Sequence, residues 1–510
     1  MRNIFLLFLI AYLVSSCKTD KMIDGEPNLI YILADDLGYG DISSFNPDSK
    51  IITPNIDRIA SKGMIFTDAH SGSAVCTPTR YGILTGRYSW RSALKQGVTW
   101  SWDKPLIDSA RLTLASILKS KGYSTACIGK WHLGLGWVLD EEKGIADFSK
   151  PLYAGPNDHG FEYSYIIPAS LDIPPYVYIE NHKITAQPDR MTSDTSKFGW
   201  WREGNTGADF VHEKVLPHLT DIAVDWINSK ANKEQPFFLY LALPAPHTPI
   251  LPTGKFRGIS NTNPYGDFVV MVDYMIGLIT EAVKSNNIED NTIIIFTSDN
   301  GCSPEADFEE LHSLGHSPSY IYRGHKADIY EGGHRIPFIL KWPDIISPGK
   351  ISNHTVSLND IMATMADITA YDLPGNAAED SYSMLPILLG KQNEYMRQSV
   401  INHSVNGYFA IRKGKWKLDV CAGSGGWSYP DEAEAEKLGL PWLQLYDLEK
   451  DPGEQNNVAE AYPDIVTELK ELLLKHISEG RSTPGPAMKN TESNNWPFNK
   501  IKYQATYNNK

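Results

Sequence analysis

The chain has 510 residues, of which 42% are hydrophobic, and it carries a formal net charge of −14. This length allows one large core with a smaller unit beside it, and the composition is that of a folded globular protein rather than a disordered one. The negative charge argues against a nucleic-acid partner, because proteins of that class neutralise phosphates with a basic face. Any anionic ligand must therefore be held by local cations.

Residues 1–17 are predicted to be an export signal. Arg2 is followed by an apolar run from Ile4 to Val14 and then by small residues. This pattern is typical of a signal peptide and is too short for a permanent membrane span. The letters VSSC, ending at Cys17, resemble a bacterial lipobox, whose cysteine becomes the lipidated first residue; a plain secretion signal is the alternative. We expect an exported protein in the periplasm or at the cell surface, anchored to the outer membrane only through lipid on Cys17.

Short apolar runs alternate with segments of helical period along residues 22–395, which predicts an α/β fold. We expect a large, mostly parallel (mixed) sheet sandwiched by helices. In chain order, the predicted elements are a strand at Asn28–Ala34, a helix at Pro54–Lys62, a helix from Cys76 closed by Gly86, a helix at Leu112–Lys121, a strand at Ser124–Gly129, a helix at Leu219–Ser229, a strand at Pro236–Leu243, a helix at Asp267–Lys284, and strands at Asn291–Ser298 and Ile336–Trp342.

The pattern changes after about residue 395. The segment NGYFAIRKGKWKLDV reads as a hairpin that turns at Lys413 and Gly414, and Pro463–His476 reads as one amphipathic helix. We therefore predict that residues 396–510 form a smaller C-terminal α+β subdomain, an antiparallel sheet covered by a helix.

Two of the predicted strands are followed by polar pairs. Asp35 and Asp36 follow the first strand, and Asp299 and Asn300 follow a later one. In an open α/β sheet, ligands bind beyond the carboxyl ends of the strands. Neighbouring side chains of a strand point to opposite faces, so both aspartates can serve one site only if the chain has left the ladder there. These oxygen ligands suit Ca²⁺ or Mg²⁺ rather than zinc, although Asp and Asn are also ordinary turn residues.

Five cysteines occur in the chain. An exported protein of this size with a disulfide framework would carry more of them, at closer spacings. Cys127 lies in an apolar run and is predicted to pack in the core. Cys302 follows an Asp-Asn-Gly segment and is expected to line a site wall. Cys76 remains as a candidate for chemistry of its own.

The stretch CTPTRYGILTGR predicts a short helix that begins at Cys76, with Pro78 in its first turn and Gly86 closing it. Cys76 and Arg80 are four positions apart and share one face, where the helix N-terminus adds its own attraction for an anion. A nucleophile, a guanidinium group and free backbone amides would then converge on one anionic group.

The pattern C-x-P-x-R followed by LTGR resembles the signature of the type I sulfatases, a family of the alkaline phosphatase superfamily. Further segments resemble that family's motifs in the same order, namely ADDLGYGD, GKWHLG, PHTP, SDNG, GHKADIYEGGHRIP and LYDLEKDPGEQNN. The resemblance covers most of the chain. It implies an alkaline phosphatase-like fold and a sulfuric ester hydrolase whose catalytic domain is residues 22–395.

The resemblance also implies the cofactors. Cys76 would be oxidised to formylglycine (3-oxoalanine) by a formylglycine-generating or anaerobic sulfatase-maturating enzyme. One hydroxyl of the aldehyde hydrate would attack sulfur, and the other would later collapse to expel sulfate. One Ca²⁺ ion would be bound by residue 76 and the two polar pairs, that is, by Asp35, Asp36, Cys76, Asp299 and Asn300.

By the same resemblance, Lys130 would bind sulfate and His132 would take the proton that triggers collapse. These two residues are expected to point the same way, because they lie two apart in an extended segment. His247 and Lys326 would hold the sulfate and the leaving oxygen, with His247 as the acid. Arg80 would orient residue 76.

Other residues are candidates for binding the substrate. Seven residues could shape a sugar pocket or equally be buried anchors: Trp100, Trp102, His159, Trp200, Trp201, His334 and Arg335. The GHKADIYEGGHR region resembles carbohydrate sulfatases that act on glycosaminoglycan or algal galactan fragments. We therefore expect a sulfated saccharide as the partner, and an exo-acting 6-O-sulfatase on galactose or N-acetylgalactosamine.

Two other functions stay open. Phosphate or phosphonate monoester hydrolases of the same superfamily share this scaffold, although two-zinc phosphatases would need several histidine ligands beside the aspartates. If Cys76 were never modified, the protein would be an inactive surface lipoprotein that binds sulfated glycans.

Overall fold

The computed structural model describes residues 25–140 and 144–492 of the chain. The signal peptide and Cys17 lie outside these residues, so export and lipid anchoring stay predictions. None of the helices in the described ranges is both long enough and apolar enough to cross a membrane.

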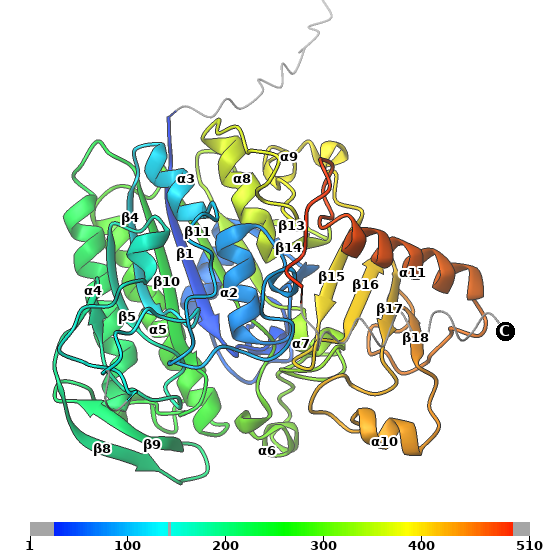
Figure 1. The fold of residues 1–510 in the computed structure, drawn as a ribbon, viewed down its shortest axis with the longest axis horizontal. Coiled ribbons are helices and arrows are strands. Elements are labelled where there is room, and N and C mark those ends of the chain that lie inside the picture. The colour runs from blue at the N-terminus through cyan, green and yellow to red at the C-terminus, as the bar shows by residue number, and fades with distance from the viewer. Residues whose placement is uncertain (1–24, 141–143, 493–510) are drawn as a thin grey trace, which may run out of the picture.

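A mixed sheet of ten strands forms the centre of the molecule, in the order β13-β2-β12-β11-β1-β10-β4-β5-β6-β7 (Figure 1). Its central strands β11, β1, β10, β4 and β5 run parallel, whereas β12 pairs antiparallel with both β11 and β2. Its strands are β1 (Asn28–Asp35), β2 (Met64–Phe66), β4 (Ser124–Lys130), β5 (Tyr163–Ile167), β6 (Ile179–Glu180), β7 (Lys183–Ile184), β10 (Phe237–Pro246), β11 (Thr292–Ser298), β12 (Phe338–Lys341) and β13 (Lys350–Ser352).

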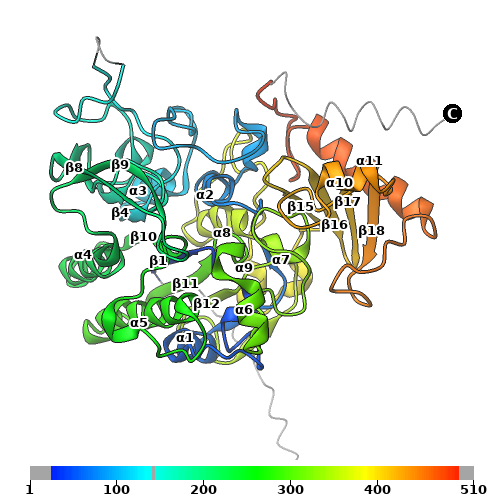
Figure 2. The ribbon, with the colours of Figure 1, turned by 90° about the horizontal axis from the view of Figure 1, so that it is seen from below.

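Helices cover both faces of this sheet, as Figure 2 shows. On one face lie α1 (Pro54–Lys62), α4 (Val215–Lys230) and α5 (Pro264–Ser285). On the other lie α2 (Cys76–Thr85), α3 (Leu114–Ser120) and α8 (Ile361–Ile368). Every residue of β1 is buried, and its side chains alternate between the two cores, as expected of a central parallel strand. The predicted α/β fold is confirmed.

Smaller elements join these layers. The short helices are α6 (Phe308–Ser313), α7 (Glu331–His334) and α9 (Leu385–Leu388). Two two-stranded sheets complete this part of the chain, one of β3 (Ala69–His70) with β14 (Val356–Ser357) and one of β8 (Pro188–Asp194) with β9 (Trp201–Gly207).

A separate antiparallel sheet lies to one side of the large one (Figure 1). It contains β15 (Ser399–His403), β16 (Phe409–Lys413), β17 (Trp416–Val420) and β18 (Leu443–Asp447), followed by α11 (Pro463–Ser478); α10 (Glu432–Lys437) lies in the connection before β18. Leucines of α11 pack on this sheet. The hairpin turns where predicted, with Gly414 at φ 57°, a left-handed conformation that suits glycine. The C-terminal antiparallel sheet with a helix is confirmed, and the boundary at residue 396 stays a prediction.

Element ends differ from the predicted ones for local reasons. α5 begins at Pro264 rather than Asp267, because the Asn263 side chain accepts from the free amides of Tyr265 and Gly266. β10 runs on to Pro246, beyond the predicted Leu243. Pattern alone does not predict β2, β5 and β13, since so few residues carry too little periodic signal.

Candidate active site

The two polar pairs lie side by side at the carboxyl edge of the large sheet. The Asp36 amide donates to Asp299 Oδ1 at 3.3 Å, and Asn300 Nδ2 donates to Asp36 Oδ1 at 2.7 Å. Asp36 has φ 63°, so the chain has left the ladder there and both Asp35 and Asp36 can face one site. The structure thus brings together Asp35, Asp36, Asp299 and Asn300.

Cys76 and Arg80 reach this edge from α2. The helix begins at Cys76 and stops before Gly86, whose φ of 61° is left-handed, as expected of a helix C-terminal glycine. Arg80 is fully buried and donates to Asp299 Oδ2 from Nε at 3.0 Å and from Nη2 at 2.6 Å. Its Nη1 donates to the Lys130 carbonyl at 2.9 Å. Arg80 therefore ties α2 to β11 and β4, and it holds Cys76 one turn away.

Lys130 ends β4 and donates to both carboxylate oxygens of Asp35, at 2.7 and 2.9 Å. Gly129 before it has φ 112°, and a Cβ there would lie 1.9 Å from the Ala242 carbonyl oxygen. Only glycine allows this close approach of β4 to β10. Burial alone would raise the pKa of Asp35, but the charges of Lys130, His247, Arg80 and Lys326 together outweigh it and hold this pKa below its usual range.

His132 faces Cys76, with Nδ1 at 3.3 Å from Sγ. Its φ is 55°, so the expected extended segment is wrong here, although the side chain still points into the site. Nε2 lies 2.8 Å from the Thr99 carbonyl; since a carbonyl only accepts, Nε2 carries the proton and Nδ1 of the neutral ring is an acceptor. Burial and the charges of Lys130 and Arg80 lower the pKa of His132 well below its usual value.

His247 and Lys326 meet at Asp36 from two other segments. Lys326 Nζ donates to Asp36 Oδ2 at 2.6 Å, and His247 Nε2 lies 3.5 Å from the same oxygen. His247 Nδ1 donates to the Thr248 carbonyl at 2.6 Å. Nε2 is therefore the nitrogen that can exchange a proton with a ligand at the site.

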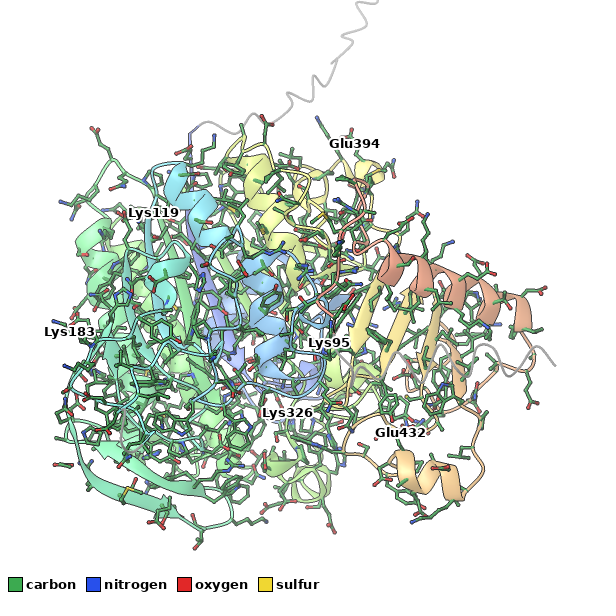
Figure 3. All side chains as sticks on the ribbon, in the orientation of Figure 1. Lys95, Lys119, Lys183, Lys326, Glu394 and Glu432 are labelled. Carbon is green, nitrogen blue, oxygen red and sulfur yellow. The ribbon has the colours of Figure 1, made fainter. Side chains whose placement is uncertain are left out.

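The segment that carries Lys326 is held by the C-terminal sheet. Ala327 has φ 80°, unusual for a residue other than glycine. Its amide donates to the Ala74 carbonyl at 2.8 Å and its carbonyl accepts from Val405 at 3.0 Å. Lys417 of β17 donates to the Ile329 carbonyl at 2.9 Å. Figure 3 labels Lys326 in the lower middle of the view, between the large sheet and the C-terminal sheet.

The acidic side chains form a cluster that fits a divalent cation. Ligand atoms of Asp35, Asp299 and Cys76 lie within 4.8 Å of one another. Burial and the charge of Asp35 raise the pKa of Asp299 to about 6, as expected where carboxylates crowd together. Asn300 Oδ1 is buried without a hydrogen-bond partner in the described structure, and an amide oxygen is a ligand that Ca²⁺ accepts.

The seven possible pocket residues divide into two groups. Trp100 and Trp102 are about half exposed, and Trp100 and Trp200 flank the guanidinium of Arg202. The other four are held by protein contacts, since His159 stacks on Trp131, Trp201 stacks on His212, and His334 and Arg335 belong to a buried charged network. A sugar-pocket role for His159, Trp201, His334 and Arg335 is therefore not supported.

The cysteines of the described residues are all free and buried. Cys127 packs in the core on the α2 face of the sheet, as predicted. The Cys302 side chain is fully buried in the core on the α5 face, and its expected place in a site wall stays a prediction. Its carbonyl accepts from the Lys326 amide at 2.9 Å.

The sequence does not identify Thr99, Asp172 or Arg202 as residues at the site. Thr99 acts through its carbonyl, which any residue has. Asp172 lies in a loop after β5, and Arg202 lies on the β8–β9 hairpin. A signal for Arg202 is present, since it directly follows the pair Trp200 and Trp201.

An α/β sheet whose carboxyl edge gathers lysines, an arginine and histidines around one buried side chain defines a hydrolase of anionic esters. The chain belongs to the Sulfatase family, whose sequence pattern matches residues 27–371. The pattern described as N-sulphoglucosamine sulphohydrolase, C-terminal, matches residues 325–479. The protein is a sulfuric ester hydrolase, which confirms the resemblance and the class of reaction.

Relatives cover nearly the whole chain. N-acetylgalactosamine-6-O-sulfatase of Bacteroides thetaiotaomicron is 39% identical over 88% of this chain and 92% of its own. Human arylsulfatase A is 31% identical over 90% of both chains.

Solved structures agree with the fold. A structure described under the metabolism of multiple glycosaminoglycans by Bacteroides thetaiotaomicron is 36% identical, with a TM-score of 0.77 over 88% of this chain and 99% of its own. Ps i-CgsB in complex with k-i-k-neocarrahexaose has a TM-score of 0.71 over 95% of this chain and 100% of its own; at 24% identity it supports the fold alone.

Proposed function

We propose that this sulfatase removes sulfate from sulfated saccharides and that residue 76 carries the attacking group. Sulfate-ester cleavage needs a nucleophile at sulfur, positive charge on the non-bridging oxygens and a proton for the departing alcohol. Five side chains supply these needs together, and their convergence on one buried site supports this proposal: Cys76, Lys130, His132, His247 and Lys326.

Lys130 and Lys326 supply the positive charge for the sulfate oxygens. Both side chains are almost fully buried, where an ammonium group interacts more strongly with an anion than it does in water. Arg80 keeps residue 76 in place through its contacts with Asp299 and the Lys130 carbonyl.

The two histidines divide the proton transfers. His132 is neutral, with the Nδ1 lone pair toward residue 76, and accepts a proton from that residue. His247 delivers a proton from Nε2 to the leaving oxygen, since its Nδ1 proton is engaged by Thr248.

Two groups complete this site in the proposal. A Ca²⁺ ion held by Asp35, Asp36, residue 76, Asp299 and Asn300 would supply Lewis-acid activation. A formylglycine-generating or anaerobic maturating enzyme would oxidise Cys76 to formylglycine, an aldehyde whose hydrate would supply a hydroxyl that can attack sulfur. Cys76 fits that group, since it stands at a helix N-terminus next to the acceptor nitrogen of His132.

For the substrate, we propose 6-O-sulfated galactose or N-acetylgalactosamine at the end of a saccharide chain. Similarity over nearly full length to an N-acetylgalactosamine-6-O-sulfatase supports this choice. We further propose that the enzyme works outside the cytoplasm, in the periplasm or at the cell surface, and that lipid on Cys17 anchors it to the outer membrane.

Sulfate release from defined substrates tests the proposal. The exported protein should release sulfate from galactose 6-sulfate or N-acetylgalactosamine 6-sulfate and hydrolyse the matched phosphate monoesters more slowly. Cys76→Ala should abolish release. Cys127→Ala, which also removes a buried thiol but lies outside the site, should retain it.

Faster hydrolysis of phosphate would reverse the assignment in favour of a phosphate or phosphonate monoester hydrolase. Intact mass distinguishes the lighter aldehyde from the thiol at residue 76. Finding only thiol, with glycan binding and no sulfate release, would favour an inactive glycan-binding protein.

A further inference from the structure

We propose that Asp172 and Arg202 bind hydroxyl groups of the sugar ring that carries the sulfate, with Trp100 as the aromatic wall beside them. This proposal rests on the proposed function and narrows it. It selects a neutral ring, with no second anionic group at that position.

Asp172 and Arg202 form a pair with unused hydrogen-bonding capacity. Arg202 Nη1 donates to the Asp172 carbonyl at 3.1 Å and to its Oδ2. The Asp172 side chain is only 9% exposed. Its Oδ1 atom is buried and accepts no hydrogen bond within the described residues. Nε and Nη2 of Arg202 have no partner there either, and its side chain is 42% exposed. One free acceptor and two free donors therefore stand next to each other.

The pair lies directly beside the catalytic groups. Asp172 Oδ1 is 4.0 Å from His247 Nδ1, and the Nε2 atom of the same ring is 3.5 Å from Asp36. On another side, Trp100 follows Thr99, whose carbonyl holds His132. A ring whose sulfate sits among the lysines and histidines would have its remaining atoms next to this pair.

Trp100 and Trp200 explain why Arg202 stays in place while half exposed. Its guanidinium carbon lies 5.3 Å from the ring centroid of Trp100 and 4.9 Å from that of Trp200, within the range of a cation–π contact. Trp100 is itself 49% exposed. An exposed indole face is a surface on which the apolar side of a sugar ring can pack.

The chemistry of the pair selects a hydroxyl over an anion. A hydroxyl group can donate a hydrogen bond to Asp172 Oδ1 while it accepts one from Arg202. A carboxylate or a second sulfate has no proton to give. It would also meet an arginine whose charge is already balanced by Asp172, and it would be repelled by the nearby free carboxylate oxygen. The site therefore suits a hexose or N-acetylhexosamine with one sulfate rather than a uronic acid or a disulfated ring.

Two substrates separate this site from the catalytic centre. N-acetylgalactosamine 6-sulfate offers ring hydroxyls, whereas 4-nitrophenyl sulfate offers only the ester. Arg202→Met and Trp100→Ala should each lower kcat/KM for the sugar sulfate by roughly 10- to 100-fold, the loss of one or more charged or stacking contacts. Their kcat/KM for the aryl sulfate should stay within about two-fold of the wild-type value, because the sulfate contacts are intact.

The matched control is Arg190→Met, which removes an arginine of the same hairpin that instead pairs with Asp189 and the Phe210 carbonyl. It should leave both substrates unchanged. Equal losses on both substrates in Arg202→Met, or no loss on the sugar sulfate, would overturn the proposal. Wild-type preference for a sulfated uronic acid over the neutral sugar sulfate would overturn it as well.

Failure of the proposed function has a different signature. In that case the wild-type protein itself would release no sulfate from either substrate. Binding affinity gives a readout that does not depend on turnover. The affinity of Cys76→Ala for N-acetylgalactosamine 6-sulfate should fall when Arg202→Met is added, by the same factor as kcat/KM falls in Arg202→Met alone. Unchanged affinity would argue against the Asp172–Arg202 pair.

Discussion

The two carboxylate oxygens of Asp299 contact different parts of the site. Its Oδ1 accepts from the Asp36 amide, and its Oδ2 accepts two N–H groups of Arg80. Without Asp299, the fully buried guanidinium of Arg80 would keep the Lys130 carbonyl and, as its carboxylate partner, Asp35 at 3.5 Å. A buried charge that loses its partner costs about 3–5 kcal/mol. Loss of activity at Asp299 therefore has to be separated from loss of the fold.

We predict that Asp299→Asn lowers sulfate release by at least about 100-fold, since the proposed cation would lose a charged ligand. Chelation of divalent cations should have the same effect on the wild-type enzyme. Sulfate release per folded molecule is the measurement. Asp380→Asn is the control, because Asp380 is another buried carboxylate paired with an arginine, Arg91, outside the site. It should lose comparable stability and keep its turnover. Retained turnover in Asp299→Asn, or in chelator, would contradict the metal assignment.

At the scale of elements, α2 determines where Cys76 and Arg80 lie. All of its residues are buried, so the helix has no solvent-facing side along which it could shift. Its end is also confined. Gly86 has a left-handed backbone, and a Cβ there would lie 3.0 Å from Met362 Sδ and from Ala378 Cα.

We predict that Gly86→Ala destabilises the protein by about 2 kcal/mol or more, of which about 1–2 kcal/mol is the cost of the left-handed conformation for alanine and the rest is crowding. Gly97→Ala supplies the comparison, because Gly97 is also left-handed, at φ 69°, but a Cβ there meets nothing within 4 Å. Denaturant unfolding of both variants measures the difference. Equal losses would mean that packing around the end of α2 contributes nothing.

At the scale of the whole molecule, the C-terminal sheet supports the segment that leads into the nucleophile position. The Ala74 amide donates to the His403 carbonyl at 3.0 Å, and His403 Nδ1 lies 3.1 Å from the Gly72 carbonyl. Together with the contacts of Val405 and Lys417 to the Lys326 segment, these bonds make the smaller sheet a support for two sides of the active site. Its separation from the large sheet should therefore cost activity as well as stability.

His403 makes this support sensitive to acid. Burial lowers its pKa to about 4, so as the pH falls from about 6.5 the unfolded chain binds a proton before the folded one does. Stability present above about pH 6.5 is lost progressively toward pH 4, by about 3 kcal/mol for this one group. Urea unfolding at pH 7 and pH 5 should show that His403→Asn, which keeps a donor for Gly72 and does not titrate, loses less stability than the wild-type protein on acidification. An equal loss would refute this role of His403.

The local sequence pattern predicts those features of the protein whose physical cause lies within a few neighbouring residues. Buried apolar runs predict the strands β1, β4, β10 and β11. Pro78 and Gly86 predict the two ends of α2, and the polar residues after two strands predict a shared cation-binding edge. The motif order added the family and its chemistry. Each of these signals is short in sequence, because helix ends and strand faces are set by adjacent residues.

Other features depend on contacts between segments far apart in the chain. Arg202 reaches Asp172 across 30 positions, and Lys326 reaches Asp36 across 290. The left-handed turn at His132 and the buried network around His334 and Arg335 likewise depend on which segments pack against them. The type of these residues does not show whether a side chain is buried against other protein groups or lines a pocket. Burial is a property of the packed chain and not of the single residue.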